Sequence, residues 1–234
     1  MSNFALNHKY TTNMLLVLEG LDGAGKSTQV ALLRKYFTER GVKVKFMHFP
    51  RFDAPLFGDL IARFLRGDLG SIDQVHPMLI ALLYAEDRRD AAPLLRSWLD
   101  DGYCVILDRY LFSNIAFQCA KYSDETKANE LRDWIFETEY NHFGIPKPDI
   151  NLFLDVPLRF VDEKLNKTRE GEDRDYLKGK RDIHEESISF QSKVRDVYLK
   201  ECGSGLLKRI DCSDNSGNML KADEIFKLIA YEIS

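Results

Sequence analysis

A glycine-rich segment near the start of the chain has the residue types and the spacing that bind the phosphates of a nucleotide. This segment, Gly20-Leu-Asp-Gly-Ala-Gly-Lys-Ser27, fits the pattern GxxxxGK(S/T) and lies between an apolar run at 14–18 and a predicted helix. The backbone N–H groups of such a loop, together with the N-terminus of the following helix, surround phosphate oxygens. The residues expected to bind a nucleoside triphosphate are Gly20, Asp22, Gly23, Ala24, Gly25, Lys26, Ser27 and Thr28.

Two pairs of side chains could do chemistry around these phosphates. Lys26 is expected to reach the β- and γ-phosphates, and the hydroxyl of Ser27 to coordinate Mg²⁺. A second pair, Asp108-Arg109, directly follows an apolar run at 103–107. Asp108 could bind in the Mg²⁺ shell or orient Arg109, whose planar guanidinium could hold a second phosphate group opposite the first. A purely structural ion pair between Asp108 and Arg109 is the alternative.

Two classes of nucleotide-binding protein fit the chain poorly. A GTPase needs Asn-Lys-x-Asp to recognise guanine, and in the nearest candidate, 166–169, Arg169 stands at the position of the aspartate. Partition and motor ATPases usually end a second apolar strand in acidic residues that include a water-activating carboxylate. Here the residues after that strand are Asp108-Arg-Tyr. The sequence therefore argues against a GTPase switch and disfavours the second class.

The elements that must position these residues alternate between apolar runs and helical segments. The runs at 14–18, 103–107 and 150–154 predict inner strands, whereas those at 42–46 and 206–210 carry charged residues and predict edge strands. The alternation predicts an α/β fold, a P-loop doubly wound five-stranded parallel sheet flanked by helices. Ligands are then expected at the carboxyl ends of the strands.

Helix boundaries are predicted from capping residues, glycine and proline. The helix after the glycine-rich loop is expected to end near Arg40, with Gly41 in the left-handed conformation just past its end. The pattern Ser71-Ile-Asp-Gln74 is a capping box, which predicts that a long helical region begins there. Pro93 is expected to break that region into two pieces before Gly102 ends it.

The composition changes between residues 164 and 181. This stretch contains seven basic residues, four acidic residues and two glycines, with almost no apolar periodicity. We expect a mobile lid whose glycines can absorb large backbone changes, and an ordinary solvated loop is the alternative. The rest of the chain divides into a flexible tail at 1–13 and a single domain at 14–234 that includes the lid.

Composition and charge limit the partners and the compartment. The chain has 234 residues, with 33 Lys and Arg against 37 Asp and Glu and a net charge of −4. No global positive field is therefore available to hold polymeric nucleic acid. The four cysteines form no CxxC pair, and no apolar run reaches the roughly 18 residues that a membrane span needs. Residues 1–13 lack the pattern of a signal or transit peptide, which predicts a cytoplasmic protein.

Five blocks of sequence together resemble the thymidylate kinase family. They occur in the family's order at 18–28, 49–51, 82–88, 108–114 and 173–174. The resemblance implies transfer of the γ-phosphoryl group of ATP to dTMP, giving dTDP and ADP and supplying dTTP synthesis for DNA replication. It also implies a homodimer packed through helices. The apolar stretches 56–65 and 77–83 could form that interface, although burial in the core explains them equally well.

Tyr84 and Arg88 lie four residues apart on a predicted helix and therefore share one face. An aromatic ring beside a guanidinium could stack on a pyrimidine and donate hydrogen bonds to its carbonyl edge; a core tyrosine and a surface arginine are the alternative. The resemblance further implies that Arg51 and Arg109 hold the dTMP phosphate and that Asp22 lies near the sugar 3′-hydroxyl. The residues expected to bind dTMP are Asp22, Arg51, Tyr84, Arg88, Arg109, Ser113, Asn114, Phe117 and Gln118.

Two positions depart from the family pattern. Many members carry an arginine in the loop where this chain has Gly23, and many have phenylalanine where it has Tyr84. Other groups must then neutralise the charge on the transferring phosphoryl group, and lid arginines, which resemble the bacterial arrangement, are the candidates. The expected catalytic residues are Lys26, Arg109, Arg169 and Arg174, and the expected metal-binding residues are Ser27 and Asp108.

Two alternative functions remain open. The first is a nucleoside monophosphate kinase that acts on another base, such as that of dUMP or UMP. The second is an ATP-dependent regulatory module whose partner responds to the bound nucleotide. Substrate dependence of ATP turnover separates both from phosphorylation of dTMP.

Overall fold

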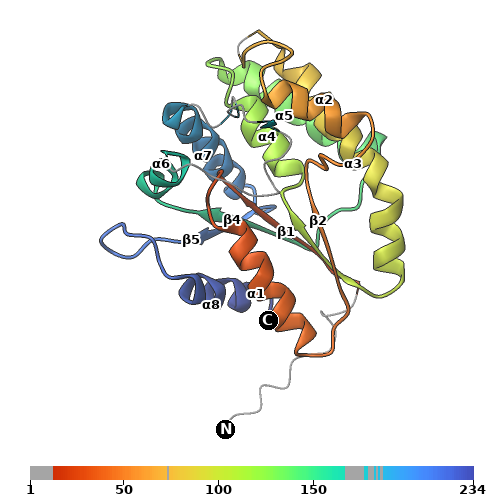
Figure 1. Ribbon diagram of the computed structural model, residues 1–234, viewed down its shortest axis with the longest axis vertical. Helices are drawn as coiled ribbons and strands as arrows, with labels where there is room; N and C mark the ends of the chain where they lie inside the picture. The colour runs from red at the N-terminus through yellow and green to blue at the C-terminus, as the bar shows by residue number, and fades with distance from the viewer. Residues whose placement is uncertain (1–12, 73, 167–176, 179–181, 183, 185–186) are drawn as a thin grey trace.

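The computed structural model describes residues 13–72, 74–166, 177–178, 182, 184 and 187–234. Its centre is a five-stranded sheet in the order β2-β3-β1-β4-β5 (Figure 1). The strands are β1 (Leu15–Gly20), β2 (Val44–His48), β3 (Cys104–Asp108), β4 (Ile150–Asp155) and β5 (Lys208–Asp211). All neighbouring strands pair in parallel. Their carboxyl ends, and the residues that follow them, therefore meet at one edge of the sheet.

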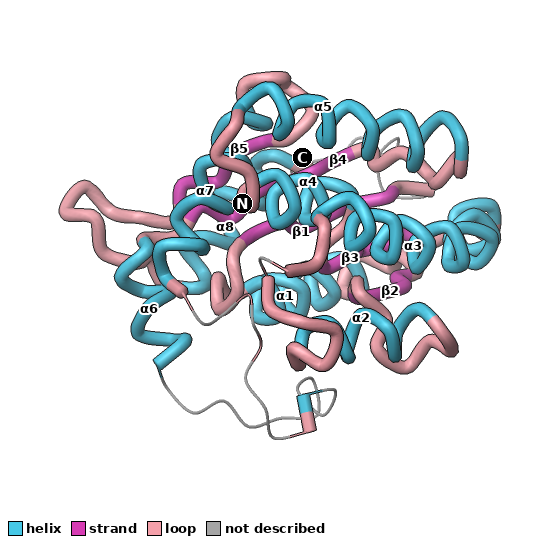
Figure 2. Tube along the Cα trace, turned by 90° about the horizontal axis from the view of Figure 1, so that it is seen from above, coloured by secondary structure: helices cyan, strands magenta, loops and turns pink. Residues whose placement is uncertain are grey.

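Helices cover both faces of this sheet. Figure 1 shows α1 and α8 on one face and α3, α4 and α7 on the other, with α2 and α5 farther out; Figure 2 shows the strands from above, among the helices. The helices are α1 (Lys26–Thr38), α2 (Phe57–Leu65), α3 (Pro77–Asp100), α4 (Leu111–Cys119), α5 (Glu125–Phe136), the π-helical turn η2 (Glu137–His142), α6 (Leu158–Asn166), α7 (Ile188–Cys202) and α8 (Ala222–Glu232).

The burial of the strands confirms the predicted inner and edge positions. Every residue of β1 and β3 is buried, whereas β2 contains no fully buried residue and β5 buries only Ile210. The order of the strands places β2 and β5 at the two edges. The bounds differ from the predicted runs by one or two residues. Gly41, with a φ of +74°, lies just past the end of α1 as predicted.

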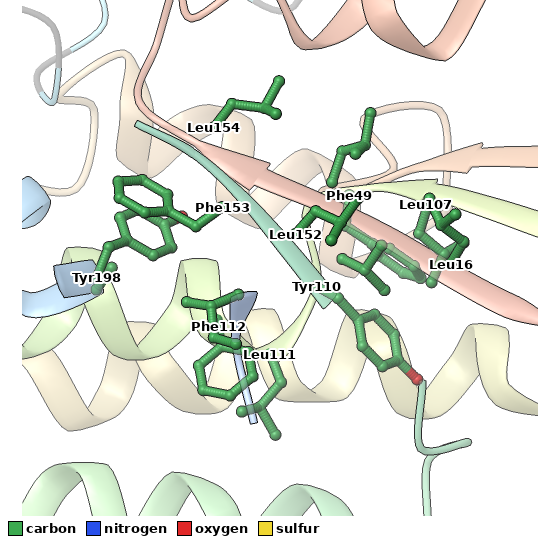
Figure 3. Packing of buried hydrophobic residues seen from close by; sticks show 14 of the residues in the cluster. Leu16, Phe49, Leu107, Tyr110, Leu111, Phe112, Leu152, Phe153, Leu154 and Tyr198 are labelled. Carbon is green, nitrogen blue, oxygen red and sulfur yellow. The ribbon is translucent and has the colours of Figure 1, made fainter. Parts of the chain in front are cut away.

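The core fixes the strand ends on which the candidate site stands (Figure 3). Leu16 of β1, Leu107 of β3 and Leu152 of β4 are fully buried in one cluster. Phe153 of β4 stacks on Tyr198 of α7, with ring centroids 4.5 Å apart and planes 14° from parallel. Full burial of one such side chain contributes about 1.5–3 kcal/mol, so this cluster holds the three central strands together and the Phe153–Tyr198 stack ties β4 to α7.

The predicted start of the long helical region is wrong. α3 begins at Pro77, and the His76 side chain caps it by accepting the Met78 N–H. In the 71–74 pattern, the Ser71 N–H donates to the Gln74 side chain at 2.9 Å, but this contact closes only a turn. Proline at the first helical position has no N–H that needs a partner, which explains why the helix begins there.

The predicted break at Pro93 is also wrong, because α3 runs through this residue to Asp100 as one helix. Buried residues of α3 lie on both sides of it, including Arg88 and Ala92 before it and Leu95 after it. Packing of the two halves against the same core outweighs the backbone hydrogen bond that proline cannot make.

Part of the predicted lid and tail lies outside the described residues. Residues 164–166 form the end of α6, but 167–176 and 179–181, which include Arg169 and Arg174, are not described, and neither are 1–12. Within the described part of the chain, no helix combines the length and the apolar character needed to cross a membrane.

Candidate active site

The glycine-rich loop joins the end of β1 to the first turn of α1. β1 ends at Gly20 and α1 begins at Lys26, with Gly25 at the N-cap position. Gly23 and Gly25 have φ values of +75° and +80°, in the left-handed region that favours glycine. Among the described residues, no side chain caps this helix, so the N–H groups of its first turn are available to an anion. The backbone therefore has the form that the phosphate-binding pattern predicts.

The Lys26 side chain folds back over this loop. Its ammonium group donates to the carbonyl oxygens of Leu21 at 3.0 Å and Gly20 at 3.4 Å, and it lies 4.0 Å from Asp108 Oδ1. Burial, reinforced by the charge of Arg109, lowers the pKa of Lys26 to about 8, against the opposing effect of Asp108. A buried ammonium group with these partners gains interaction energy when a phosphate arrives.

Asp108 ends β3 beside this lysine. Burial by itself would raise the pKa of Asp108, but the charge of Lys26 and the hydrogen bond with His48 lower it to about 2. His48 Nδ1 lies 3.4 Å from Asp108 Oδ2, whereas Oδ1 is buried without a hydrogen-bond partner among the described residues. The carboxylate therefore stays ionised with one oxygen incompletely satisfied.

Arg109, the next residue, combines a strained backbone with a guanidinium that is held on several sides. Its φ of +68° is unusual for a residue with a side chain, at a cost of about 1–3 kcal/mol. Nη2 donates to Asp22 Oδ1 at 2.7 Å, and Nη1 donates to Ser113 Oγ at 3.1 Å. The guanidinium carbon also lies 5.1 Å from the centre of the Phe117 ring. These contacts bring the loop, the end of β3 and α4 together around one cation.

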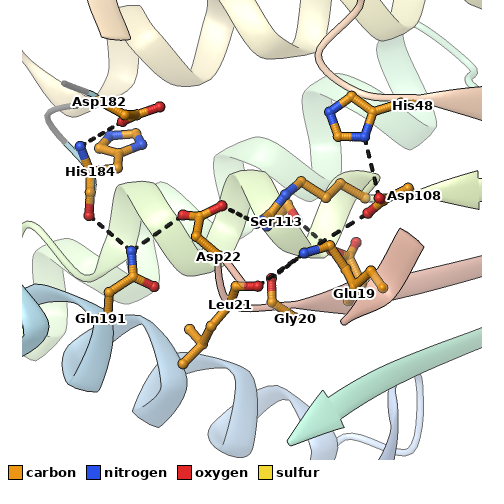
Figure 4. Close-up of polar contacts among 12 residues, drawn as sticks. Glu19, Gly20, Leu21, Asp22, His48, Asp108, Ser113, Asp182, His184 and Gln191 are labelled. Atoms are coloured by element: carbon orange, nitrogen blue, oxygen red, sulfur yellow. Dashed lines mark hydrogen bonds and ion pairs between the residues drawn. The ribbon is translucent and has the colours of Figure 1, made fainter. Parts of the chain in front are cut away.

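Glu19, which was not predicted as a site residue, supports Arg109 through a buried network. Glu19 accepts a hydrogen bond from the Ser113 hydroxyl (Figure 4). It also accepts from the Tyr110 N–H at 3.0 Å and from the Tyr198 hydroxyl at 3.2 Å. Burial raises the pKa of Glu19, although the hydrogen bond from Ser113 opposes the shift. The signal for it in the sequence is a lone acidic residue inside an apolar strand.

Asp22 connects the loop to the start of α7, as Figure 4 shows. Asp22 Oδ2 accepts from Gln191 Nε2 at 3.3 Å, and the same amide donates to the His184 carbonyl oxygen at 2.9 Å. Burial by itself would raise the pKa of Asp22, but the charges of Arg109 and Lys26 hold it below its usual value. Gln191 and His184 follow the predicted lid in the sequence, so residues beyond the lid also contribute to this site.

Arg51 follows β2 and is paired with two carboxylates of α3. Its Nε donates to Asp87 Oδ1 at 2.8 Å, and its Nη2 donates to Asp90 Oδ2 at 2.7 Å. The Arg51 backbone N–H also donates to Asp87, at 3.0 Å. These contacts fix the guanidinium within the protein, and its contact with a dTMP phosphate stays a prediction.

Tyr84 and Arg88 lie one turn apart on α3, but Arg88 is fully buried, which rules out a surface arginine. Its Nε and Nη2 donate to the Glu139 carboxylate at 2.5 and 2.7 Å, and Asn114 Nδ2 donates to the same carboxylate at 2.9 Å. Burial, with a further effect from the charge of Asp182, raises the pKa of Tyr84. The tyrosine hydroxyl is therefore neutral at physiological pH.

The structure brings most of the predicted residues to the edge of the sheet where β1 and β3 end. Along α4, Gln118 is buried; its Oε1 accepts from Lys121 at 2.7 Å, and its Nε2 has no partner in the described part of the chain. Ser27 and Thr28 are exposed in the first turn of α1. The residues that gather through direct contacts are Lys26, Asp108, Arg109, Asp22, Ser113 and Phe117.

Two further contributors were missed for a physical reason. Glu139 lies 51 residues from Arg88 along the chain, and Gln191 lies 169 residues from Asp22. No local pattern in the sequence indicates that such pairs meet.

Known proteins are similar to this chain over most of its length. The family model described as "Thymidylate kinase" matches residues 18–222. A protein named probable thymidylate kinase from Thermococcus kodakarensis is 38% identical over 192 residues, which cover 80% of this chain and 83% of that protein. The thymidylate kinase of Mycobacterium tuberculosis strain H37Rv is 34% identical over 194 residues, covering 82% and 87%.

A solved structure of thymidylate kinase from Candida albicans is also similar, with a TM-score of 0.70 and 26% identity over 94% of this chain and 90% of that one. The family match begins at Leu18, within β1, and continues past β5, so it includes the loop, the Asp108-Arg109 pair and the α4 residues that meet in the site. From a match of this extent we conclude that the chain belongs to the thymidylate kinase family.

Proposed function

We infer that the protein transfers the γ-phosphoryl group of ATP to dTMP, giving dTDP and ADP and supplying dTTP synthesis for DNA replication. The observation that carries this function is the position of the Arg109 guanidinium, 2.7 Å from Asp22 of the phosphate-binding loop. The loop by itself indicates only a bound nucleotide. A second phosphate-binding cation beside it is what a phosphate acceptor requires.

The loop prepares ATP for transfer through its own groups. The phosphates of ATP bind along residues 20–28, where the N–H groups of the first turn of α1 face them. Lys26 exchanges the carbonyl oxygens of Leu21 and Gly20 for oxygens of the β- and γ-phosphates. The attacking group is an ionised phosphate, so no general base is needed, and catalysis rests on alignment and charge neutralisation.

The acceptor binds opposite ATP. Arg109 and Arg51 hold the dTMP phosphate with the N–H groups that their carboxylate partners leave free, and Asp22 lies near the sugar 3′-hydroxyl. Tyr84 stacks on the pyrimidine. Arg88 and Asn114 contact the edge of the base, while Ser113, Phe117 and Gln118 line the pocket. The burial of these α4 side chains and their contacts with Arg109 and Glu139 support this assignment.

The residues at the ends of β3 and the loop fit Mg²⁺. Asp108 offers an ionised carboxylate with one buried oxygen that accepts no hydrogen bond from the described residues, and Ser27 offers an exposed hydroxyl. We propose that these two side chains hold the ion together with phosphate oxygens, since Mg²⁺ is usually bound by one or two carboxylates plus substrate phosphates. When bound, the ion neutralises charge on the β- and γ-phosphates.

Arg169 and Arg174 are proposed to neutralise the charge on the transferring group, because Gly23 leaves the loop without an arginine. An arginine supplied in this way accelerates related reactions by about 10³- to 10⁵-fold. Replacing both residues with alanine should therefore reduce the single-turnover rate far more than the affinity for ATP. An unchanged rate would exclude the proposed role.

We further propose a cytoplasmic homodimer that does not bind polymeric nucleic acid, in keeping with the net charge of −4. Leu56, at the N-cap of α2, and Leu79 of α3 expose 64% and 60% of their surface, and Met78 is exposed beside Leu79. A second copy that covered these side chains would bury apolar surface. Light scattering should give the mass of a dimer for the natural chain and of a monomer for Leu79→Glu.

An assay coupled to ADP release, run with ATP, Mg²⁺ and each common nucleoside monophosphate, tests the function. We expect rapid turnover that depends on dTMP. A higher kcat/KM for dUMP or UMP would assign the enzyme to another base. Slow ATP hydrolysis that ignores dTMP would instead support an ATP-dependent regulatory module.

A further inference from the structure

A buried carboxylate on a π-helical turn joins the two side chains that face the acceptor base. Glu139 lies in η2, between α5 and β4, and has no exposed surface. Turns of this kind are rare and frequently occur at functional sites. Here the turn delivers one carboxylate to Arg88 of α3 and Asn114 of α4, at 2.5–2.7 Å and 2.9 Å respectively.

The contacts of Asn114 fix which end of its amide is available. Nδ2 donates to Glu139 Oε1 at 2.9 Å and to the Ala81 carbonyl oxygen at 3.0 Å, which uses both of its hydrogens. A flipped amide would place its oxygen against two other acceptors, so these partners specify the orientation. Oδ1 is left buried without a hydrogen-bond partner among the described residues. The free end of Asn114 is therefore an acceptor.

The contacts of Arg88 fix its free end in the same way. Within the described part of the chain, Glu139 occupies Nε and Nη2 of the guanidinium. Because the group is planar and rigid, the pair also fixes the direction in which the remaining nitrogen, Nη1, points. One carboxylate thus determines both a free donor, on Arg88, and a free acceptor, on Asn114.

This order of donor and acceptor matches one class of pyrimidine. Thymine and uracil present a carbonyl oxygen, O4, next to an N3–H donor, so each finds its complement in Arg88 and Asn114. Cytosine presents the reverse order, with an amino group next to an N3 acceptor, and would meet donor against donor and acceptor against acceptor. The arrangement therefore selects a 4-oxo pyrimidine.

We propose that Glu139 is the positioning residue that sets this base preference, although it does not touch the base itself. The proposal rests on phosphorylation of dTMP by this protein and names the residue that controls selection against dCMP. A carboxylate suits the task because both of its oxygens are acceptors. An amide at the same place would present an N–H to one partner and would leave only the Ala81 carbonyl oxygen to hold Asn114 in this orientation.

Glu139→Gln, which keeps the size of the side chain, is the direct test, with kcat and KM measured for dTMP, dCMP and ATP. Each well-placed contact of this kind discriminates by about 5- to 150-fold. We expect the ratio of kcat/KM for dTMP to that for dCMP to fall by about tenfold or more, through KM for the acceptor, with KM for ATP unchanged. An unchanged ratio would overturn the proposal.

Glu201→Gln is the matched control. Glu201 is also buried and also forms a two-point pair with an arginine, Arg132, at 2.6 and 3.0 Å, but it joins α7 to α5. A general effect of losing a buried ion pair should lower thermal stability in both variants. We expect the dTMP to dCMP ratio to stay at the natural value in Glu201→Gln, and an equal fall in both variants would contradict a specific role for Glu139.

A second variant covers the case in which Glu139→Gln does not fold. Glu139→Asp keeps the charge, but its shorter side chain cannot reach both partners, so the ratio of kcat/KM for dTMP to that for dCMP should again fall. The ratio of the natural protein in this variant would overturn the proposal.

Activity of the natural protein separates the proposed function from the role of Glu139. If it does not phosphorylate dTMP, the proposed function fails; if it does and neither variant alters the ratio, only the role of Glu139 fails.

Discussion

At the scale of single residues, the site is a set of buried charges that balance one another. Burial and the charge of Arg109 lower the pKa of Lys26, whereas, against the effect of burial, the charges of Asp22 and Asp108 raise the pKa of both Lys26 and Arg109. Arg109 is paired at 2.7 Å with Asp22, but Lys26 has its nearest carboxylate oxygen at 4.0 Å. Lys26 is therefore the cation whose protonation responds most to an incoming phosphate.

Binding of ATP at about pH 8.5 should take up a large fraction of one proton, because burial lowers the pKa of Lys26 to about 8 and a phosphate raises it again. Affinity for ATP should accordingly decrease as the pH rises past that value. Calorimetric titrations in buffers with different ionisation enthalpies measure the uptake. Lys26→Arg, whose cation does not titrate in this range, should bind ATP without it. Equal uptake by the two proteins would reject this role for Lys26.

Arg88→Ala should weaken binding of dTMP far more than binding of ATP, because the guanidinium is proposed to contact the base and lies on α3, away from the phosphate-binding loop. We expect kcat/KM for dTMP to fall by about 100-fold, the scale of a lost charged hydrogen bond and its unpaired partner. The variant also leaves Glu139 buried without its counter-ion, which costs about 3–5 kcal/mol of stability.

Arg132→Ala controls for that loss, because it removes the partner of the buried Glu201 on the far side of α7. Its thermal stability should fall while KM for dTMP stays at the natural value. Equal losses of dTMP and ATP binding in Arg88→Ala would contradict a contact with the base.

At the scale of elements, α3 carries residues proposed for the acceptor site in its first half and core residues on both sides of Pro93. Arg88 is buried before Pro93, and Ala92 and Leu95 are buried around it, so the helix is held from both ends. The proline itself is exposed and leaves the helix without one internal hydrogen bond. Local propensity therefore opposes this helix at one position, and tertiary packing stabilises it.

Pro93→Ala should stabilise the protein without changing its activity. Alanine restores the missing N–H donor and is the stronger helix former, which outweighs the extra freedom of the unfolded chain by about 1 kcal/mol or more. For a chain of this length we expect the midpoint of thermal unfolding to rise by about 2–4 °C. Leu94→Ala, at the exposed neighbour, should not raise it. A lower midpoint in Pro93→Ala would mean that the helix depends on the proline.

The sequence predicts the elements well where a pattern is local and poorly where partners are distant. Inner strands are recognised by continuous apolar runs, and edge strands by runs that contain charged residues. The reason is that a strand whose two faces are both buried has no place for a lysine side chain. The loop and the Asp108-Arg109 pair are equally local. Glu139 could not be found in this way. It meets Arg88 only because β3, α4 and α5, which lie between α3 and η2 in the chain, fold so that the two residues come together.

At the scale of the whole molecule, His184, which precedes α7 in the sequence, packs onto the site and joins the stability of the protein to the site. His184 is 4% exposed, with its ring centroid 5.2 Å from that of Phe117, 5.5 Å from Phe64 and 5.6 Å from Phe190. It thus bridges α2, α4 and α7. The charged groups that act on it from other elements are Lys121, Asp22 and Arg109.

Burial, reinforced by the charge of Lys121, holds the pKa of His184 well below its usual value of 6.5. The unfolded chain takes up a proton at this histidine as the pH falls through that value, but the folded chain does not. The free energy of unfolding should therefore decrease on acidification, by at most about 1.4 kcal/mol per pH unit from this group. His184→Phe keeps an aromatic ring among Phe64, Phe117 and Phe190 and removes the titration.

Urea unfolding of the natural chain and of His184→Phe, measured at several values between about pH 5 and 7.5, isolates this contribution, because carboxylates that titrate in both proteins cancel in the difference. The stability of the variant relative to the natural chain should rise as the pH falls and should be constant near neutrality. The same substitution at the exposed His142 is the control for a change of histidine to phenylalanine outside this buried cluster. Parallel curves for His184→Phe would show that His184 takes up a proton as readily in the folded protein as in the unfolded chain, and would contradict the effect of its burial.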